Sequence, residues 1–458
     1  MTRDPNDKSC RDLLRLAMPL MLGMSGFMIM QFMDAMFLAW HSPEALAAIG
    51  PAGLASFLLV CLFQGVAGYA GTFAAQYIGA GRPRRAGAAI WQGIYVALVS
   101  AVFVACAAQA GPALFYGAGH TGMLARMEIA FFRIACWGAL PGLLVSAFSG
   151  LFTATERTRS LMIVQLVGLV WNGVAAWLLV LGHGGFPRLG ITGAALAMVS
   201  AQSVNALLLA WLFFRARERR DYGTWSERRL DWTLFGRLLR FGVPSGARMA
   251  VEILAWTVFM FFVGRVGTAD LAATNIAWRI NGASFFPLIG MAQAVSVYVG
   301  QCQGRGRPDL SRRIVYRGLA MSEAWMLICG AFFVFLPGPL IRLFFEAGAM
   351  SNSEQASLFG LSVMMLRFVA AYSFLDACNV VVLSALQSAG DTRWTFAANL
   401  VAYGLFIGAL ILFDRLHAGI VAQWWLITVF VLLVALTWLL RFASGRWRNI
   451  RVIEPLAP

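Results

Sequence analysis

Three carboxylates lie in the middle of long apolar stretches, where an ionisable side chain is costly to keep. They are Asp34 in MQFMDAMF, Glu252 in MAVEILAW and Asp376 in SFLDACNV. A carboxylate in such surroundings can lose its charge by taking up a proton, or keep it by binding a cation. These residue types in these positions therefore indicate ion or substrate binding inside an apolar medium.

Glu252 also has a purely structural interpretation. Arg248 precedes it by four residues, on the same face of a helix, and such a pair can neutralise itself. Asp34 and Asp376 have no basic residue at helical spacing. A fourth acid, Glu323, is expected to be peripheral.

Several polar residues share the same apolar stretches and are candidates for lining a cavity. They are Gln31, Asn172, Asn275, Arg248 and Arg279. The four histidines fall in expected turns between apolar stretches, and the seven cysteines are scattered singly without a CxxC or Cys/His spacing. No Ser/His, Cys/His or metal-ligand constellation is present, so an enzyme is not expected.

The elements that must position these residues are hydrophobic helices. The 458 residues are 60% hydrophobic and only 12% charged, whereas a soluble domain carries about twice that charged fraction. Apolar runs of the ~20 residues that a helix needs to cross a bilayer recur from end to end. The expected spans are 14–39, 46–75, 87–110, 125–150, 160–182, 190–214, 236–262, 270–300, 314–336, 356–387, 394–413 and 418–440. The sequence predicts an all-α integral membrane protein with twelve transmembrane helices.

The second half of the chain repeats the first at an offset of 225 positions. Matching residues are Pro19 and Pro244, Gly65 and Gly290, Gln76 and Gln301, and the turns GAGRP at 79–83 and GRGRP at 304–308. Six helices in each copy is an even number. We therefore expect two six-helix bundles related by a pseudo-two-fold axis along the membrane normal.

The repeat also sets the expected domain limits. Residues 1–214 form an N-terminal bundle, 215–235 a linker, 236–445 a C-terminal bundle and 446–458 a tail. The three carboxylates break this symmetry. At the offset of 225 Asp34 meets Phe259 and Glu252 meets Phe27, and at the offset of 234 that holds later in the repeat Asp376 meets Gly142. A charge needed only to build the shared scaffold would appear in both copies, so the asymmetry favours function.

Lysine and arginine predict the orientation of the chain. One side of the twelve spans carries 23 of these residues and the other side five, and the richer side is expected to be cytoplasmic. Both termini, the linker and the two glycine-arginine turns then lie on the cytoplasmic face of the plasma (inner) membrane. The net charge of +15 does not indicate nucleic-acid binding, because the basic residues occupy short turns rather than one face.

The motifs resemble those of the multidrug and toxic compound extrusion (MATE) family over nearly the whole chain. Residues 270–313, DLAATNIAWRINGASFFPLIGMAQAVSVYVGQCQGRGRPDLSRR, are similar to the family's eighth helix and following turn. FMDAMF, the RFGVP that precedes Glu252 and LDACNVVVLSALQSAGDT around Asp376 match further family motifs. Asn172 matches a family asparagine, although Ala176 stands where a second polar residue is common.

Glu252 together with Asp376 resembles the NorM-type branch of that family. The resemblance implies a multidrug antiporter, coupled to sodium or protons, that exports amphipathic and mostly cationic compounds by alternating access. It implies a coupling-ion site at Asp376, Glu252 and Asp34, with sodium, if that is the ion, at Glu252 and Asp376. The expected partners are small-molecule cations and the lipid bilayer, without another cofactor, and a monomer is expected.

An alternative function is a flippase for a lipid-linked oligosaccharide or another anionic lipid. Such a cavity would be lined by cations that match phosphate. Arg248 and Arg279 fit that idea, but three carboxylates without counterparts in the other repeat count against it. The sequence leaves the choice between sodium and protons open.

Overall fold

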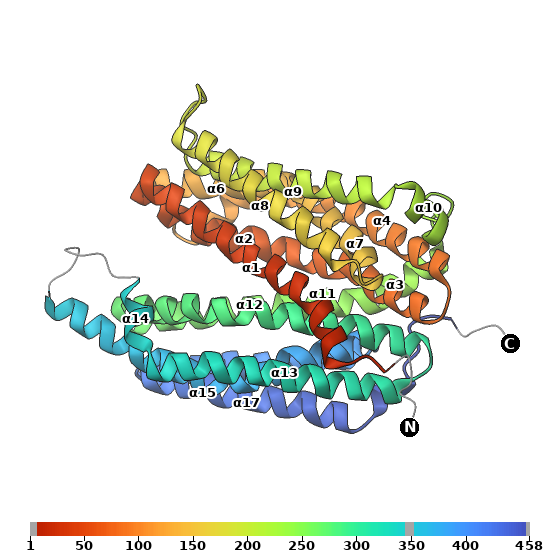
Figure 1. Ribbon diagram of the computed structural model, residues 1–458. Coiled ribbons are helices and arrows are strands. Elements are labelled where there is room, and N and C mark those ends of the chain that lie inside the picture. Colours follow the sequence, from red (N-terminus) through yellow and green to blue (C-terminus); the bar gives the residue numbers. More distant parts are fainter. Residues whose placement is uncertain (1–6, 344–351, 455–458) are drawn as a thin grey trace. The chain divides into compact units, whose positions relative to one another are not determined.

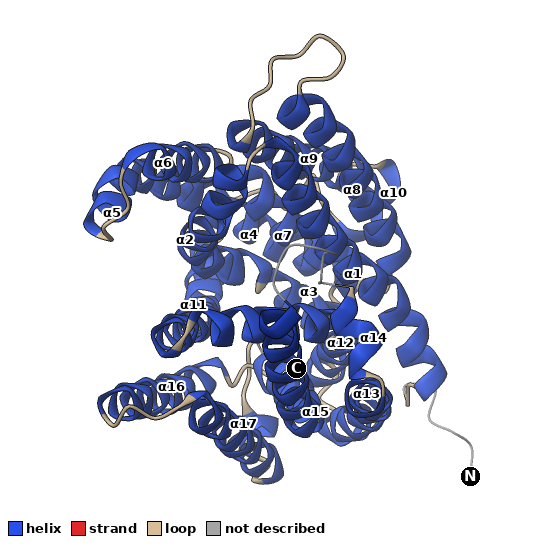
Figure 2. Ribbon diagram, turned by 90° about the vertical axis from the view of Figure 1, so that its left-hand side faces the viewer, coloured by secondary structure: helices blue, strands red, loops and turns tan. Residues whose placement is uncertain are grey.

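The computed structural model describes residues 7–343 and 352–454. Helices make up nearly all of this part of the chain, and no strand occurs in it (Figure 2). The helices are α1 (Cys10–His41), α2 (Pro43–Gly68), α3 (Ala70–Gly79), α4 (Pro83–Ala107), α5 (Gly111–Gly117), α6 (Gly122–Trp137), α7 (Ala139–Ala154), α8 (Thr158–Leu181), α9 (Ile191–Phe213), α10 (Ala216–Tyr222), α11 (Trp232–Val266), α12 (Thr268–Gly304), α13 (Pro308–Phe335), α14 (Pro337–Arg342), α15 (Asn352–Ser388), α16 (Thr392–Arg415) and α17 (Ile420–Ala443), with short 3-10 turns at Ala108–Ala110 and Arg446–Asn449.

The prediction of twelve apolar spans is confirmed for the described residues. Eleven segments are long and apolar enough to cross a membrane, and α6 with α7 forms a twelfth that is bent by 43°. Gly138 lies at this bend, where an added Cβ would collide with the side chain of Val199 on α9. The glycine thus lets α9 approach the backbone at the point where the span bends.

The described residues fall into two compact units. Unit 1 takes the chain up to Met21, Val251–Val299 and Pro308–Ile450, and unit 2 takes Leu22–Ala250, Gly300–Arg307 and the residues from Arg451. Each of the long helices α1 and α11 changes unit shortly after its internal proline, Pro19 or Pro244. Proline removes a helical hydrogen bond, which makes both positions natural places for a helix to bend. The domain limits expected from the sequence, with a linker at 215–235, stay a prediction.

Inside each unit, long helices pack side by side. In unit 2 α8 lies along α9, and in unit 1 α13 lies along α15 (Figure 1). Glycines allow the closest crossings. A Cβ on Gly65 would lie 2.6 Å from Cα of Gly246 in unit 2, and a Cβ on Gly290 would lie 2.5 Å from N of Met21 in unit 1. At the 225-residue offset, Gly65 corresponds to Gly290 and Met21 corresponds to Gly246. The repeat therefore preserves a helix crossing as well as a sequence.

The two glycine-arginine turns share an unusual backbone conformation. Gly81 has φ +73° and Gly306 has φ +70°, in the left-handed region that glycine adopts without strain. Proline begins the following helix in both cases, at Pro83 and Pro308. The positive φ and the start of a new helix explain why these turns contain glycine and proline.

The glycines that end α3 and α12 serve a close approach between the two turns inside unit 2. A Cβ on Gly79 would collide with the carbonyl oxygen of Gln301, and a Cβ on Gly304 would collide with that of Gln76. At the 225-residue offset Gly79 corresponds to Gly304 and Gln76 to Gln301, so the same contact is made in both directions. Two copies of the turn are kept because each one packs against the other.

Candidate functional site

In unit 2, the intramembrane carboxylate of Asp34 has one hydrogen-bond partner among the described residues. Asp34 on α1 is 8% exposed, and Asn172 on α8 is fully buried. The Asn172 side-chain amide donates a hydrogen bond of 2.8 Å from Nδ2 to Oδ1 of Asp34. The sequence singled out both residues separately, and the structure brings them together across 138 positions.

Small residues around this pair allow tight packing. A Cβ on Gly173 would collide with the terminal methyl group of Met33, and one on Gly168 would collide with the side chain of Asn205 on α9. The Oδ1 atoms of Asn172 and Asn205 are buried and accept no hydrogen bond from the described residues. These two amide oxygens can each accept a hydrogen bond or ligate a cation. Asn205 was not among the residues that the sequence indicated.

Unit 1 contains two carboxylates, Asp376 and Glu252, that lie within electrostatic range of each other. Asp376 on α15 and Glu252 on α11 are both half-buried, and their negative charges lie close enough to interact unfavourably. Asn379 follows Asp376 by one turn, and its side-chain amide donates to the carbonyl oxygen of Val431 at 3.4 Å. Tyr372, one turn before Asp376, is 4% exposed and lies within electrostatic range of the same carboxylate. One face of α15 thus supplies a phenol, a carboxylate and an amide.

An aromatic cluster in unit 1 begins one helical turn from Glu252. Trp256 packs edge-on against Trp278 of α12, with ring centroids 5.3 Å apart. Trp424 of α17 packs against Phe259 and also against Tyr372, with ring centroids 6.5 Å apart in the second pair, which connects the cluster to the residue beside Asp376. Further members of the cluster are Phe259, Tyr403, Phe406, Trp424 and Phe430. Aromatic faces attract cations, so carboxylates and rings together favour an organic cation over an anion.

The remaining predicted cavity residues are distributed over both units. Asn275 and Arg279 are exposed on the same face of α12 in unit 1, and the Asn275 amide donates to the carbonyl oxygen of Leu271 at 3.0 Å. Gln31 is exposed on α1, and Arg248 is half-buried on α11, both in unit 2. These positions assign no role to the four side chains.

Glu323 on α13 is a further intramembrane carboxylate of unit 1. The thiol of Cys378 on α15 donates a hydrogen bond of 3.1 Å to its Oε1 atom. Its Oε2 atom is buried and has no hydrogen-bond partner among the described residues. Glu323 therefore belongs to the packed α13–α15 interface, on a different face of α15 from Asp376.

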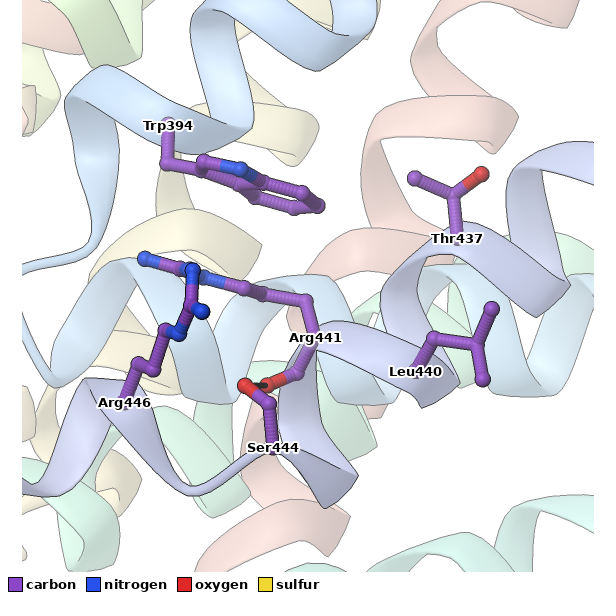
Figure 3. A pocket seen from close by; sticks show the side chains of 6 residues that line it. All are labelled: Trp394, Thr437, Leu440, Arg441, Ser444 and Arg446. Carbon is purple, nitrogen blue, oxygen red and sulfur yellow. Dashed lines mark hydrogen bonds between the residues drawn. The ribbon is translucent and has the colours of Figure 1, made fainter.

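A surface pocket of about 290 Å³ lies elsewhere in unit 1, at the start of α16 and the end of α17 (Figure 3). It is lined by Trp394, Thr437, Leu440, Arg441, Ser444 and Arg446. Arg441 donates to both oxygens of Asp391, at 2.6 Å and 3.1 Å, and lies 4.5 Å from the Trp394 ring centre. These contacts anchor helix ends, and none of the candidate carboxylates lines this pocket.

The donor set near Asp376 suits a hard monovalent cation. Carboxylate, amide and phenol oxygens are the ligands that hard cations such as calcium and magnesium prefer, and sodium shares this preference. Within the described ranges, no three His, Cys, Asp or Glu side chains come together. Sodium does not need such a cluster, because amide, phenol and backbone oxygens complete a ligand shell.

Comparison with known families gives one match. The family model described as MatE matches residues 19–178 and again residues 244–410. The two matched segments begin 225 positions apart, at Pro19 and Pro244. The internal repeat is thus also a property of the family model.

Curated relatives align over nearly the whole chain. A "Probable multidrug resistance protein NorM" of Pseudomonas syringae pv. tomato is 28% identical over 453 residues, covering 96% of this chain and 95% of the relative. Another protein with this name, from Burkholderia pseudomallei, is 28% identical over 422 residues, covering 90% and 88%.

Solved structures share the fold. One described as the outward-facing conformation of a multidrug resistance MATE family transporter of the MOP superfamily has a TM-score of 0.85 and 20% identity, covering 96% of this chain and 98% of that one. A MOP superfamily transporter from Pyrococcus furiosus has a TM-score of 0.86 and 20% identity, covering 97% and 98%. The predicted fold class, twelve transmembrane helices in two bundles, is confirmed.

Proposed function

Because the chain belongs to the MatE family of membrane transporters, we propose that it is a NorM-type multidrug antiporter, coupled to sodium ions or protons. The observation that carries this proposal is the carboxylate pair Glu252 and Asp376 beside an aromatic cluster. The relatives named as multidrug resistance proteins support the drug-efflux part. No cofactor other than the coupling ion is part of the proposal.

The carboxylate pair supplies the coupling. Two negative charges in an apolar region repel each other, and a proton or a sodium ion relieves that repulsion. A cationic drug relieves it as well, so ion and drug compete for the same charges. The ion drives transport because it binds one of the two alternating-access states more tightly than the other.

The aromatic cluster supplies the preference for amphipathic cations. Trp256 and Trp278 offer apolar surface and negative ring faces next to Glu252 and Asp376. Flat, apolar molecules with one positive charge match both features. Enzymatic chemistry is not part of this function.

Asp34 with Asn172 is proposed as a second coupling-ion position, in unit 2. Its single carboxylate is already satisfied by one amide, so it has less need of a cation than the pair in unit 1. Gln31, Arg248, Asn275 and Arg279 are proposed to line the substrate cavity together with Asn172.

The lipid-flippase alternative has less support. It rests on Arg248 and Arg279, whereas three carboxylates and an aromatic cluster favour a cation. Arg248 also has a neighbouring acid, Glu252, within one helical turn. The relatives named as multidrug resistance proteins point away from it as well.

The proposed setting is the plasma (inner) membrane, crossed as a monomer with both termini in the cytoplasm. Single engineered cysteines in the Arg215–Asp231 segment and in each glycine-arginine turn should react only with reagents that reach the cytoplasm. Labelling from the periplasmic side at any of them would contradict the orientation.

Everted vesicles test the function itself. Uptake of a fluorescent organic cation should follow an imposed sodium gradient or an imposed proton gradient, and an anionic lipid probe should not be flipped. Lipid flipping without cation uptake would replace the antiporter by the flippase. Equal cation uptake with neither gradient would exclude ion coupling.

A further inference from the structure

The carboxylate of Glu454, in the C-terminal tail, lies among four donors contributed by three helices and a turn of unit 2. Tyr77 on α3 and Arg237 on α11 each donate to Oε2 at 2.7 Å. Arg85 on α4 donates to Oε1 at 3.3 Å and 3.4 Å, and Arg82 of the first glycine-arginine turn is 3.7 Å from the same atom. We call these four donors the carboxylate cradle.

The cradle has an excess of positive charge that the tail offsets. Arg85 also forms an ion pair with Asp231 at 3.0 Å, so the three guanidinium groups face two carboxylates, Glu454 and Asp231. Burial disfavours the charged form of Glu454, but the Tyr77 hydrogen bond and the arginines outweigh it, so its pKa lies below the ordinary value. Glu454 is therefore ionised at neutral pH.

The cradle is not part of the repeated scaffold. At the 225-residue offset, Tyr77 meets Cys302, Arg85 meets Leu310 and Arg237 meets Asp12. Arg82 alone has an arginine counterpart, Arg307. Because three of these four donors have no counterpart in the other half of the chain, they indicate that the cradle binds a ligand rather than that it builds the turn common to both halves.

The tail is held at two places. Trp447 in unit 1 is 1% exposed, stacks on Phe442 and donates to its carbonyl oxygen at 2.9 Å. The chain then leaves unit 1 after Ile450, and Val452, which is 2% exposed, and Glu454 belong to unit 2. The eight residues from Trp447 to Glu454 form a short connection between these two contacts.

We propose that the carboxylate cradle is a binding site whose ligand is the chain's own Glu454, and that the occupied site makes the C-terminal tail a latch. The latch favours the state in which the two glycine-arginine turns pack against each other, as they do in unit 2. Its regulatory part rests on the alternating-access function proposed above, whereas the binding site does not.

Trypsin reports on the binding site in the full-length protein. Arg451 lies between the two anchors, and cleavage after it requires the tail to leave the cradle. Charge-assisted hydrogen bonds to a carboxylate suggest that Glu454→Gln and Arg237→Gln should each raise the cleavage rate by about tenfold to a hundredfold. Glu44→Gln makes the same chemical change at an exposed site at the start of α2 and should leave the rate unchanged.

Two results would overturn the binding site. One is a cleavage rate in Glu454→Gln equal to that of the unchanged protein, and the other is an equal rise in Glu44→Gln. The charge-reversed pair Arg237→Glu with Glu454→Arg provides a second check that does not depend on the yield of one variant. It should restore at least part of the protection that either single reversal removes.

Cys302 reports on the latch. It is 1% exposed and adjoins Gln301, whose carbonyl oxygen lies against Gly79. Glu454→Gln should increase modification of Cys302 by a membrane-permeant maleimide several-fold, as measured by mass spectrometry of the labelled peptide. Faster cleavage after Arg451 with unchanged Cys302 labelling would support the binding site for Glu454 and contradict the latch. A protein that fails to transport would overturn the proposed function without altering the cleavage result.

Discussion

The two units hold their intramembrane carboxylates in different ways. In unit 2, Asp34 is alone, 8% exposed and hydrogen-bonded to the amide of Asn172 at 2.8 Å. In unit 1, Asp376 and Glu252 are half-buried, repel each other and lie beside aromatic side chains. The first arrangement is one carboxylate with an amide donor, whereas the second is two carboxylates beside aromatic rings.

From this difference we propose that unit 1 carries the larger share of ion coupling. A lone carboxylate that accepts an amide hydrogen bond gains little from binding a cation, but two neighbouring carboxylates gain much. Because the 225-residue repeat supplies the same scaffold twice, the two units serve as internal controls for each other. Each prediction below changes one side of the comparison.

The largest effect is expected for Asp376→Asn. The amide keeps the shape but removes the charge, so gradient-driven efflux should fall to background while yield and melting temperature stay unchanged. Efflux from everted vesicles and a thermal melt in detergent measure both quantities. Efflux at the unchanged rate would remove this carboxylate from the coupling site.

Glu252→Gln separates the two interpretations of Glu252. If Glu252 binds the coupling ion, the variant should be obtained in normal amounts and should not transport. If its role is to neutralise Arg248, the loss of one partner should leave an uncompensated charge and lower the yield instead. Comparing yield with transport per folded molecule distinguishes the two results. Arg248→Gln should give the same result as Glu252→Gln.

Asn172→Ala tests the unit 2 side of the comparison. Asp34 loses its hydrogen-bond donor, and leaving a buried polar group unsatisfied costs about 1–3 kcal/mol. The melting temperature should therefore fall, and Asn172→Ala combined with Asp34→Leu should recover most of the loss. If the single variant is as stable as the unchanged protein, the pair is not the local stabilising contact that the geometry indicates.

Trp256→Leu should have a smaller and more selective effect. A cation over an aromatic ring gains about 0.5–2 kcal/mol, so the KM for an organic cation should rise by about twofold to thirtyfold while kcat changes little. Trp425→Leu is the matched control, since Trp425 on α17 is 58% exposed. Equal effects of both substitutions would indicate general disturbance of unit 1.

The helical architecture follows from the sequence because its signals are local. Apolar runs of bilayer length set the spans, and the glycines of the two turns occur where the backbone needs a positive φ, at Gly81 and Gly306. The 225-residue offset relates Gly65 to Gly290, and both glycines lie at equivalent close crossings. Even the bend near Gly138 falls inside the expected span 125–150.

What the sequence could not predict depends on contacts between distant helices. Asp34 and Asn172 are 138 positions apart, and only the packing of α1 against α8 puts one in reach of the other. The aromatic cluster was missed because aromatic residues make up 13% of the chain, so Trp256 and Trp278 did not stand out. Glu454 follows the last apolar run by several residues, and no local pattern marks it as a partner for Arg237.

Counterion movement during drug efflux tests most directly whether unit 1 carries the coupling. Proteoliposomes would contain the unchanged protein, Asp376→Asn or Asp34→Asn, and sodium or proton flux would be recorded on addition of the drug. We predict that Asp376→Asn loses drug-evoked counterion flux, whereas Asp34→Asn, in which the amide oxygen still accepts from Asn172, keeps most of it. The opposite pattern, with flux retained in Asp376→Asn and lost in Asp34→Asn, would contradict the assignment of coupling to unit 1.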